Sequence, residues 1–414
     1  MRNFLNRFKK QLIIFLIVAG PGFITAFADN DAGGVATYSV AAAKYGYQIL
    51  IILIPITLIL AVTQEVGARI TLATGKGLAD LIRERFGIMT TFFIFGLTSL
   101  VNFGVILQDI SGLKSALQLF HINYQIFLPI ILVLLILFLI KSSYSKIEKL
   151  LFFVMFFYLT YFFSAIMAKP DWGFVAKSLF VPNGKISFDF IYTSIAVLGT
   201  TVTLWGQFVI SSTIKDKKIT PSKMKFQQLE IYLASILSNT FTLFMIVAVS
   251  ATLFVNKINI EGAAEAALAI KPFAGNLAGV LFGVGLFAAG FLGCLIVPLS
   301  TAYAFSEFFG YQGSLNDNFK KSRFFYIFFI AQIIIGAIIA LQPKFSLFQF
   351  TIFASFINGI TLPVIFYYLY KFSNDRDLMD KYKNNWLQNF LIISSAVLII
   401  IGSIIGVVGQ IFHF

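Results

Sequence analysis

Cysteine is almost absent from this chain, which has 414 residues and a single cysteine, Cys294, together with two histidines. One cysteine excludes an intrachain disulfide and any metal site built from several thiolates. Because Cys294 lies within an apolar run, we expect a small buried side chain with no redox role. His121 and His413 lie in a loop and in the terminal tail. Neither is placed to relay protons across a membrane.

Charge is scarce as well, since charged residues make up 12% of the chain against 58% hydrophobic residues. This composition excludes a water-soluble globule and predicts a protein that crosses the membrane many times. The net charge of +13 is spread over short loops instead of forming one basic stripe. The basic residues therefore predict topology, and no nucleic-acid partner is expected.

Apolar segments need about 20 residues to cross a bilayer. Eleven segments of the chain meet this condition, and the first contains an interruption. The predicted spans are 12–43, 47–73, 89–111, 124–141, 149–168, 188–213, 226–255, 273–309, 323–341, 347–371 and 387–412.

The orientation follows from lysine and arginine, which are in excess in cytoplasmic loops. The amino terminus and alternate loops hold 22 of the 31 basic residues, whereas the opposite loops and their flanks hold 8. We therefore expect the amino terminus in the cytoplasm and, after eleven spans, the carboxyl terminus outside, in a cell (inner or plasma) membrane.

The chain is organised around residues 20–34, GPGFITAFADNDAGG, where Asp29 and Asp31 lie inside the first predicted span. An acid at this depth normally faces the interior of a bundle or a water-filled cavity. Gly33 and Gly34 have the lowest steric cost for leaving a helix, and unwound backbone is tolerated in a membrane only where protein or a cavity surrounds it. We expect a discontinuous helix whose carbonyls and carboxylate bind a cation. The alternative is a helix end at an interface, but an apolar run resumes at Val35.

A second interruption is predicted in the sixth span, where the segment 198–208 is unusually polar and includes Thr200, Thr203 and Gln207. Two interruptions in corresponding places of two halves are typical of inverted repeats with an ion site at the midplane. In the alternative interpretation, the threonines bond to carbonyls of their own helix and bend it without binding anything.

Other polar residues within spans allow weaker predictions. Glu65 and Arg69 are four residues apart and are expected to pair on one helix face. Asp109 is a candidate for a proton or ion route, or lies near a helix end beside Lys114. Ser355 and Asn358 share a face of the tenth span, as ligands or as interhelical hydrogen-bonding groups.

The predicted fold class is an all-α integral membrane protein. Residues 1–168 form a first repeat of five helices and 188–371 a second, joined by an extracellular linker at 169–187. Residues 372–414 add a cytoplasmic loop and an eleventh helix.

Several segments resemble the NRAMP family of divalent-metal transporters, which has a LeuT-type fold of two inverted five-helix repeats with broken helices 1 and 6. The resembling segments are 20–23 with 31–34, 67–80, 199–202, and 362–363 followed by 373–379. In the family the first motif reads Asp-Pro-Gly-Asn and its aspartate binds the metal. Asp31 matches that aspartate, whereas Gly34 replaces the asparagine ligand.

The departures from the family pattern concern the ligand atoms. In the sixth span the family reads roughly Ala-Thr-Val-Met-Pro-His, with the methionine sulfur and the alanine carbonyl on the metal. Here Thr200 stands at the alanine and Thr203 at the methionine, and Leu204 and Trp205 replace proline and histidine. Oxygen ligands suit Mg²⁺, Ca²⁺ and Mn²⁺ better than soft metals. The chain thus looks like the NRAMP-related magnesium transporters, a divergent branch.

The resemblance also bears on proton movement. Positions that hold proton-linked histidines and an acid in typical members are Trp205, Ile210 and Gly112 here, so only Asp109 of that set remains. We expect transport without proton coupling, driven by the membrane potential.

The resemblance implies a divalent cation transporter that favours Mg²⁺ and also takes Mn²⁺, with Asp31 as the central ligand. Asp29 is expected to act through water, Ala28 and Thr200 through carbonyls, and Thr203 through its hydroxyl. Ser355, Asn358 and Gln207 are secondary candidates. The expected partners are the metal substrate and the lipid bilayer, with no resident cofactor, no obligate protein partner and no enzymatic activity.

Three other functions are compatible with the sequence. A proton-coupled Mn²⁺/Fe²⁺ importer has the ordinary family activity but normally uses sulfur and imidazole groups. A sodium-coupled carrier of an organic solute would bring a substrate carboxylate against Asp31. An intramembrane aspartyl protease needs two converging carboxylates, whereas Asp29 and Asp31 are two residues apart and diverge on a helix.

Overall fold

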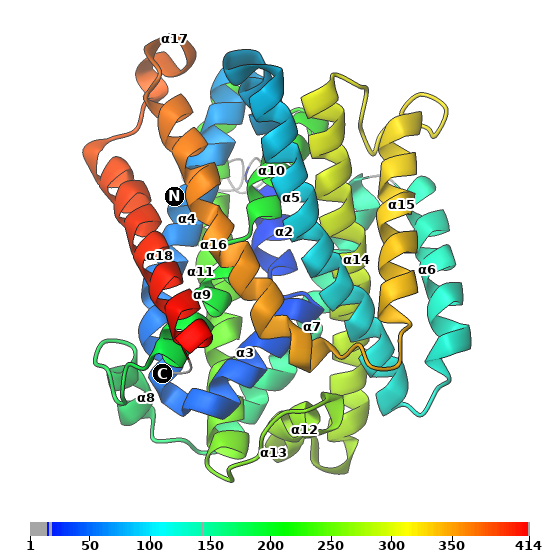
Figure 1. Ribbon diagram of the computed structural model, residues 1–414, viewed down its shortest axis with the longest axis vertical. Helices are drawn as coiled ribbons and strands as arrows, with labels where there is room; N and C mark the ends of the chain where they lie inside the picture. Colours follow the sequence, from blue (N-terminus) through cyan, green and yellow to red (C-terminus); the bar gives the residue numbers. More distant parts are fainter. Residues whose placement is uncertain (1–14, 16–18, 143, 413–414) are drawn as a thin grey trace, which may run out of the picture.

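The computed structural model describes residues 15, 19–142 and 144–412 (Figure 1). Most of the start of the first predicted span and His413 lie outside the described residues. All regular structure in the described part of the chain is helical, as predicted.

The described part of the chain contains α-helices (α) and short 3₁₀- or π-helices (η). They are α2 (Pro21–Ala28), α3 (Ala32–Tyr45), η1 (Gly46–Ile52), α4 (Leu53–Thr74), α5 (Leu78–Leu119), α6 (Tyr124–Ile140), α7 (Tyr144–Met167), α8 (Trp172–Ser178), α9 (Phe188–Thr201), α10 (Leu204–Asp216), η2 (Pro221–Lys223), α11 (Met224–Val249), η3 (Ser250–Phe254), α12 (Ala263–Ala267), η4 (Leu268–Ile270), α13 (Lys271–Ala274), η5 (Gly275–Leu277), α14 (Ala278–Phe309), α15 (Arg323–Ala340), α16 (Leu347–Asn374), α17 (Arg376–Met379), η6 (Asp380–Tyr382) and α18 (Trp386–Phe412).

The helices correspond to the eleven predicted segments. Eight helical stretches of the described chain are long and apolar enough to cross a membrane. One of them, Ala32–Thr74, contains two predicted segments, because the chain turns at Gly46, where φ is 56°. The remaining two segments are α6, with 17 residues, and α7, with 24.

The third predicted span starts too late. Helix α5 begins at Leu78 instead of residue 89, because a short charged helix precedes a kink at Gly87, where φ is 77°. Asp80 and Arg83 make this first part polar. A search for apolar runs therefore excludes it.

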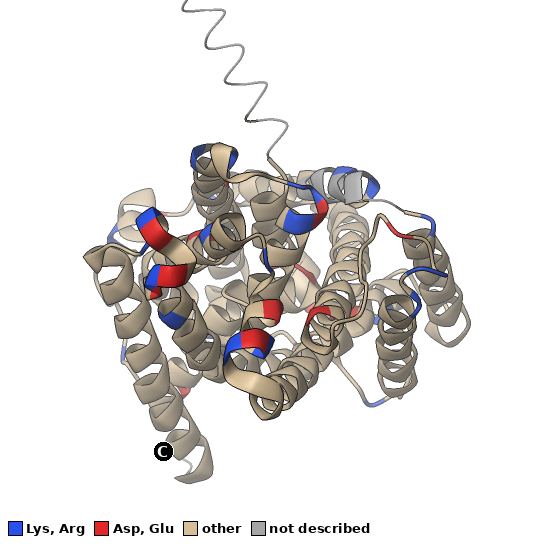
Figure 2. Ribbon diagram, turned by 90° about the horizontal axis from the view of Figure 1, so that it is seen from above, with Lys and Arg blue, Asp and Glu red and all other residues tan. Residues whose placement is uncertain are grey.

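The connections between spans gather at two ends of the molecule. Helix α17 and the starts of α5 and α18 lie at one end, and α8, α12 and α13 lie at the other (Figure 1). Figure 2 looks onto the α17 end, where Lys and Arg lie on loops and helix ends while the bodies of the helices are almost free of charge. The loops with the predicted basic excess therefore share one end.

Glycines allow the central helices to approach closely. Helix α5 packs most extensively on α14, where a methyl group at Gly293 would overlap the carboxylate of Asp109. Helices α9 and α16 cross at Gly199 and Gly359, and a methyl group at Gly199 would overlap the carbonyl oxygen of Ser355. Small residues at such contacts are typical of helix packing in membranes.

The outer surface is apolar, as expected for contact with lipid. Large exposed hydrophobic side chains follow α6, α15 and α18, for example Leu134 (58% exposed), Ile338 (60%) and Leu398 (67%). Cys294 is fully buried in α14, in agreement with its predicted role as a packing residue.

Candidate functional site

The first helix is broken where the sequence predicts it. Helix α2 ends at Ala28, and α3 begins at Ala32 with Asp31 as its N-cap. The Asp31 Oδ1 atom accepts a hydrogen bond from the backbone N–H of Gly34 at 2.8 Å. Asp29 and Asp31 are 1% and 3% exposed, so both carboxyl groups lie inside the bundle. The alternative of a helix end at a membrane interface does not fit this burial.

The role predicted for the two glycines needs correction. Gly33 and Gly34 lie in the first turn of α3 and do not leave the helix; the unwound residues are 29–31. A methyl group at Gly33 would come within 2.8 Å of the Gln108 side-chain oxygen, and one at Gly34 would overlap the carbonyl oxygen of Asp29. These glycines therefore allow close packing at the break. They do not cause the helix to unwind.

Asn30 anchors the break to two neighbouring helices. Its Nδ2 atom donates to Ser238 at 2.7 Å, and its Oδ1 atom accepts from Thr242 at 3.1 Å, both on α11. Its carbonyl oxygen accepts from the hydroxyl of Tyr158 on α7. The backbone at the break thus has a defined position, although the N–H groups of Asn30 and Asp31 bond to carbonyls three residues earlier instead of four.

The second break meets the first. Helix α9 ends at Thr201 and α10 begins at Leu204, with Thr203 as N-cap. The Thr203 hydroxyl accepts from the N–H of Gly206 at 3.1 Å and donates to Asp29 Oδ1 at 3.0 Å. The N–H of Leu204 donates to the side-chain oxygen of Asn358 on α16 at 3.2 Å. The Thr203 side chain therefore caps the start of α10 and also joins the two interrupted helices.

Other predicted site residues lie around this junction with different partners. The carbonyl of Ala28 accepts from the N–H of Asp31 at 3.1 Å. Thr200 lies in the last turn of α9, where helix carbonyls lack intrahelical partners. Gln207 faces α4 and donates weakly to Thr63 at 3.4 Å, while its side-chain oxygen is buried without a hydrogen-bond partner among the described residues.

Ser355 belongs to a separate polar cluster against α3. Its hydroxyl shares hydrogen bonds with Thr37 at 2.9 Å and with Gln108 at 3.1 Å. Thr351, one turn earlier on α16, donates to the carbonyl of Gly33 at 3.1 Å. Asn358 and Ser355 thus connect α16 to both broken helices, which agrees with the interpretation that they bridge helices.

Asp109 lies in the interior and not at a helix end. Its Oδ1 atom accepts from the N–H of Ala32 at 3.2 Å, directly beside Asp31 in the chain. Lys114 does not pair with it, because the ammonium group donates to the carbonyls of Ala340, Gln342 and Phe345 at 2.7–3.0 Å. The alternative that placed Asp109 near a helix end beside Lys114 is therefore wrong.

Glu230 on α11 is a buried acid that was not among the predicted site residues. Its carboxylate accepts from the N–H groups of Gly20, Gly22 and Phe23 at 2.8–3.1 Å and so caps the start of α2. Gly20 has a φ of 149°, and a methyl group at Gly22 would come within 2.7 Å of the carboxylate. The sequence did contain a signal for Glu230: it is an acid inside a predicted span, and no basic residue lies three or four positions away to pair with it.

The chemistry of the junction is that of oxygen donors. Asp29 Oδ2 and Asp109 Oδ2 are buried without hydrogen-bond partners among the described residues. Within the described chain, no three His, Cys, Asp or Glu side chains are grouped closely enough to hold a metal ion. A cation at the junction would therefore need hydroxyl, carbonyl or amide oxygens, or water, besides the carboxylates, and this donor set suits hard cations.

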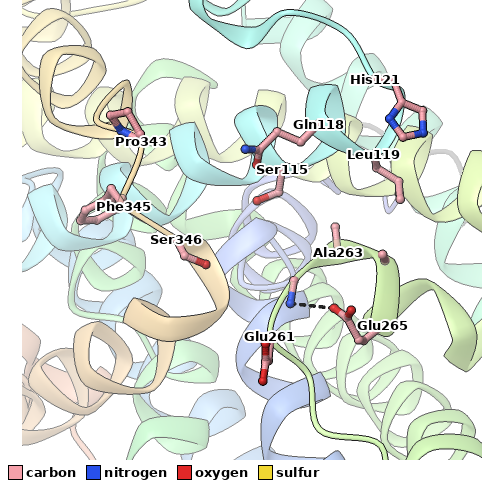
Figure 3. Close-up of a pocket in the computed structure, with 12 residues that line it drawn as sticks. Ser115, Gln118, Leu119, His121, Glu261, Ala263, Glu265, Pro343, Phe345 and Ser346 are labelled. Atoms are coloured by element: carbon pink, nitrogen blue, oxygen red, sulfur yellow. Dashed lines mark hydrogen bonds between the residues drawn. The ribbon is translucent and has the colours of Figure 1, made fainter.

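A cavity of about 550 Å³ lies at the end of the molecule opposite α17, between the end of α5, the 261–265 segment and the start of α16 (Figure 3). Glu265 receives a hydrogen bond from the N–H of Gly262 at 2.9 Å, and Ser115 of α5 lies on the lining. Ser115 is three residues from Gly112, which packs against Ala32 at the break. Ser115 on the cavity lining is therefore about 4.5 Å along the helix axis from that contact.

A family model and curated relatives match the chain along most of its length. The model for Nramp, natural resistance-associated macrophage protein-like, matches residues 22–409. A divalent metal cation transporter MntH of Listeria welshimeri is 24% identical over 413 residues, covering 95% of this chain and 89% of the relative. A metal transporter nramp1 homolog of Dictyostelium discoideum is 26% identical over 400 residues, covering 92% and 72%.

Solved structures show the same fold. A manganese transporter of Eremococcus coleocola, in complex with an aromatic bis-isothiourea compound, superposes with a TM-score of 0.76 at 18% identity, covering 96% of this chain and 87% of that one. MHP1, a nucleobase-cation-symport-1 family transporter, superposes with a TM-score of 0.62 at 13% identity, covering 94% and 92%. The architecture is the LeuT-type fold expected from the sequence.

Proposed function

Because the chain belongs to the Nramp family, we propose that it transports divalent metal cations and that the junction of its two broken helices is the ion site. The proposal is supported by relatives named as divalent metal cation transporters. The observation that carries it is the hydrogen bond of 3.0 Å from Thr203 to Asp29, which joins the two breaks beside the buried carboxyl group of Asp31.

In this proposal Asp31 is the central anionic ligand. Its carboxylate is fixed by the N–H of Gly34, so it is oriented before an ion arrives. The carbonyls of Ala28 and Thr200 and the hydroxyl of Thr203 would complete the donor set, with Asp29 acting through water. A buried carboxylate with oxygen neighbours costs free energy until a cation compensates its charge.

We further propose a preference for hard cations, Mg²⁺ first and Mn²⁺ as well. A methionine stands at the position of Thr203 in typical members, and its sulfur would favour softer metals. Mg²⁺ loses water reluctantly and usually keeps several water ligands. Gly34 replaces the family's asparagine ligand, so water would supply the contact that the asparagine makes in typical members.

The orientation in a cell membrane is also part of the proposal. The α17 end, where the loops with the basic excess gather (Figure 2), would face the cytoplasm. The cavity beside Ser115 and Glu265 (Figure 3) would then open to the outside. Its position near the Gly112–Ala32 contact makes it the expected approach for ions.

The test is uptake by liposomes that contain the Asp31→Asn variant. Asparagine is as good an N-cap as aspartate, so this variant keeps the bond to Gly34 and removes only the charge. We expect Mg²⁺ and Mn²⁺ uptake to fall to the level of protein-free liposomes, while the thermal unfolding midpoint stays near that of the wild type. Uptake by Asp31→Asn or Asp31→Ala at the wild-type rate would refute the site.

A second candidate function is proton-coupled Mn²⁺ import. It is favoured by the hydrogen bond from Ala32 to Asp109, which places a second buried carboxyl group at the break, and by the manganese transporters among the structural relatives. It predicts acidification of the liposome interior during uptake. The sodium-coupled carrier and the protease have no comparable support.

A further inference from the structure

A second cavity, of about 460 Å³, lies at the α17 end of the molecule and is separate from the junction of the broken helices. It is bounded by the end of α4, the start of α11 and the segment that leads from η6 into α18. Its volume is within the range of about 300–1,000 Å³ that is usual for small-molecule sites.

The floor of this cavity is a buried ion pair that the sequence analysis predicted as structural. Arg69 Nε lies 2.7 Å from Glu65 Oε1, and the two side chains are 5% and 0% exposed. Gln228 of α11 and Gln388 of α18 donate to the Glu65 carboxylate at 2.7 and 2.9 Å. The pair therefore holds α4, α11 and α18 together beneath the cavity.

Arg69 also holds the segment that forms one wall. Its Nη2 atom donates to the side-chain oxygen of Asn384 at 2.7 Å, and its Nη1 atom donates to the carbonyl of Tyr382. The wall is thus held from below by α4 through Arg69. Because Glu65 balances the charge of Arg69, the floor itself is close to neutral.

The rim, in contrast, is basic. Lys225, Lys381 and Lys383 line the cavity, and no acidic side chain is among its described lining residues. The ion pairs found in the described residues involve none of these three lysines. Three positive charges around one small cavity predict an anionic ligand with several acceptor oxygens, such as a phosphate ester.

Exposed apolar side chains continue from the cavity along the two helices beside it. Leu229 and Leu233 of α11 are 49% and 44% exposed, and Trp386 and Phe390 of α18 are 77% and 59% exposed. Tryptophan at the start of a membrane helix typically lies at the level of the lipid headgroups. The basic rim therefore lies at the boundary between headgroups and acyl chains.

We propose that this cavity binds the headgroup of an anionic glycerophospholipid, with the phosphate between Lys225, Lys381 and Lys383 and the acyl chains along α11 and α18. The proposal rests on the orientation proposed above, which places the cavity in the cytoplasmic leaflet, where anionic lipids attract basic clusters. It is independent of the ion site. A bound lipid would connect the segment between η6 and α18 to α11 and stabilise the packing around α4.

The test measures the thermal unfolding midpoint of the detergent-solubilised full chain during titration with dioleoyl-phosphatidylglycerol. The pocket variant carries Lys225→Gln, Lys381→Gln and Lys383→Gln. The matched control carries Lys141→Gln, Lys320→Gln and Lys371→Gln, which remove the same charge from the same end without touching the cavity. All six lysines are at least partly exposed, so both variants are expected to fold.

We expect phosphatidylglycerol to bind the pocket variant on the order of 100-fold more weakly than the wild type, the effect of three basic residues near an anionic lipid. The control should bind it as the wild type does, and phosphatidylcholine should stabilise none of the proteins to the same extent. Equal binding by pocket variant and control would overturn the proposal. So would equal stabilisation of the wild type by glycerol 3-phosphate or inorganic phosphate, which would assign the cavity to a soluble anion.

Discussion

At the scale of single residues, the junction depends on side chains that each make two connections. Thr203 both caps α10 and donates to Asp29, and Asp31 both caps α3 and carries the buried charge. Substitutions at such positions change helix stability and ligand chemistry together. Conservative replacements that keep the helix cap and change only the ligand atom, or the reverse, therefore separate the two roles.

Thr203→Met is expected to shift ion preference towards soft metals. It introduces a thioether where the chain has a hydroxyl, and sulfur favours softer cations than oxygen does. We expect the affinity for Cd²⁺ relative to Mg²⁺ to rise on the order of 10- to 100-fold, the range seen when groups around metal ligands change. Competition of Cd²⁺ with Mg²⁺ uptake measures this ratio.

The matched control for that experiment is Thr203→Ser, which keeps the hydroxyl, the N-cap and the hydrogen bond to Asp29. Its Cd²⁺-to-Mg²⁺ ratio should equal that of the wild type. If Thr203→Met left the ratio unchanged, Thr203 would have no place among the ligands, whatever its effect on stability.

Residue identities explain part of what sequence reasoning achieved at the site. Asp29 and Asp31 stood out because acids inside an apolar run have few structural explanations. The functions of Gly33 and Glu230 could not be predicted, because each depends on a contact distant in sequence. The function of Gly34 depends on the local shape of the break, where a methyl group would overlap the carbonyl oxygen of Asp29. Glu230 meets the start of α2 across about 210 residues, and a single sequence does not reveal such pairings.

At the scale of helices, α2 is held at both ends by groups from other elements. Glu230 caps its start, and the Asn30 amide, bound to α11, fixes the chain beyond its end. The helix has only eight residues, and helices this short are marginal without tertiary support. Its position therefore depends on α11.

Glu230→Ala is expected to destabilise the protein markedly. It leaves three N–H groups at the start of α2 without their acceptor, and each buried unsatisfied group costs about 1–3 kcal/mol. Glu230→Gln keeps one acceptor oxygen and should cost less. The thermal unfolding midpoint in detergent should fall in the order wild type, Glu230→Gln, Glu230→Ala.

Leu229→Ala is the control, because Leu229 is 49% exposed on the same helix and its apolar side chain cannot accept a hydrogen bond from the start of α2. Its midpoint should stay close to that of the wild type. If the Glu230→Ala and Leu229→Ala proteins had the same thermal unfolding midpoint, α2 would not need this cap.

The positions of the spans and of both breaks were predictable at the scale of elements, since apolar run length and embedded polar residues determine them. The start of α5 was not, because its first turns are charged and lie before the Gly87 kink. Short helices such as α8, α12 and α13 were also absent from the prediction. Helices α8 and α12 lie outside the predicted spans and α13 overlaps only the start of one, so the length of the apolar runs does not reveal them.

At the scale of the whole molecule, the two ends differ in charge, while the buried carboxyl groups of Asp29, Asp31 and Asp109 lie together in the middle. A dication that enters from the less basic end would move down an inside-negative potential, which is worth about 2.3 kcal/mol per charge per 100 mV and so about twice that for the ion. This driving force needs no second ion.

Uptake without acidification is the corresponding prediction. Liposomes that contain the protein, a metal-sensitive dye and a pH-sensitive dye should accumulate Mg²⁺ when an inside-negative potential is imposed, and the internal pH should stay constant. Uptake should rise with the imposed potential. A fall in internal pH that tracks uptake and disappears in Asp109→Asn would instead support the proton-coupled alternative.

The complete burial of Cys294 in α14 has a practical consequence. Since the chain has no other thiol, a cysteine introduced near Ser115 or Glu265 would be the one group within reach of a water-soluble maleimide. The rate of its labelling, with and without the transported ion, would then report changes in access to the cavity lined by Ser115 and Glu265, without any need to replace the native cysteine first.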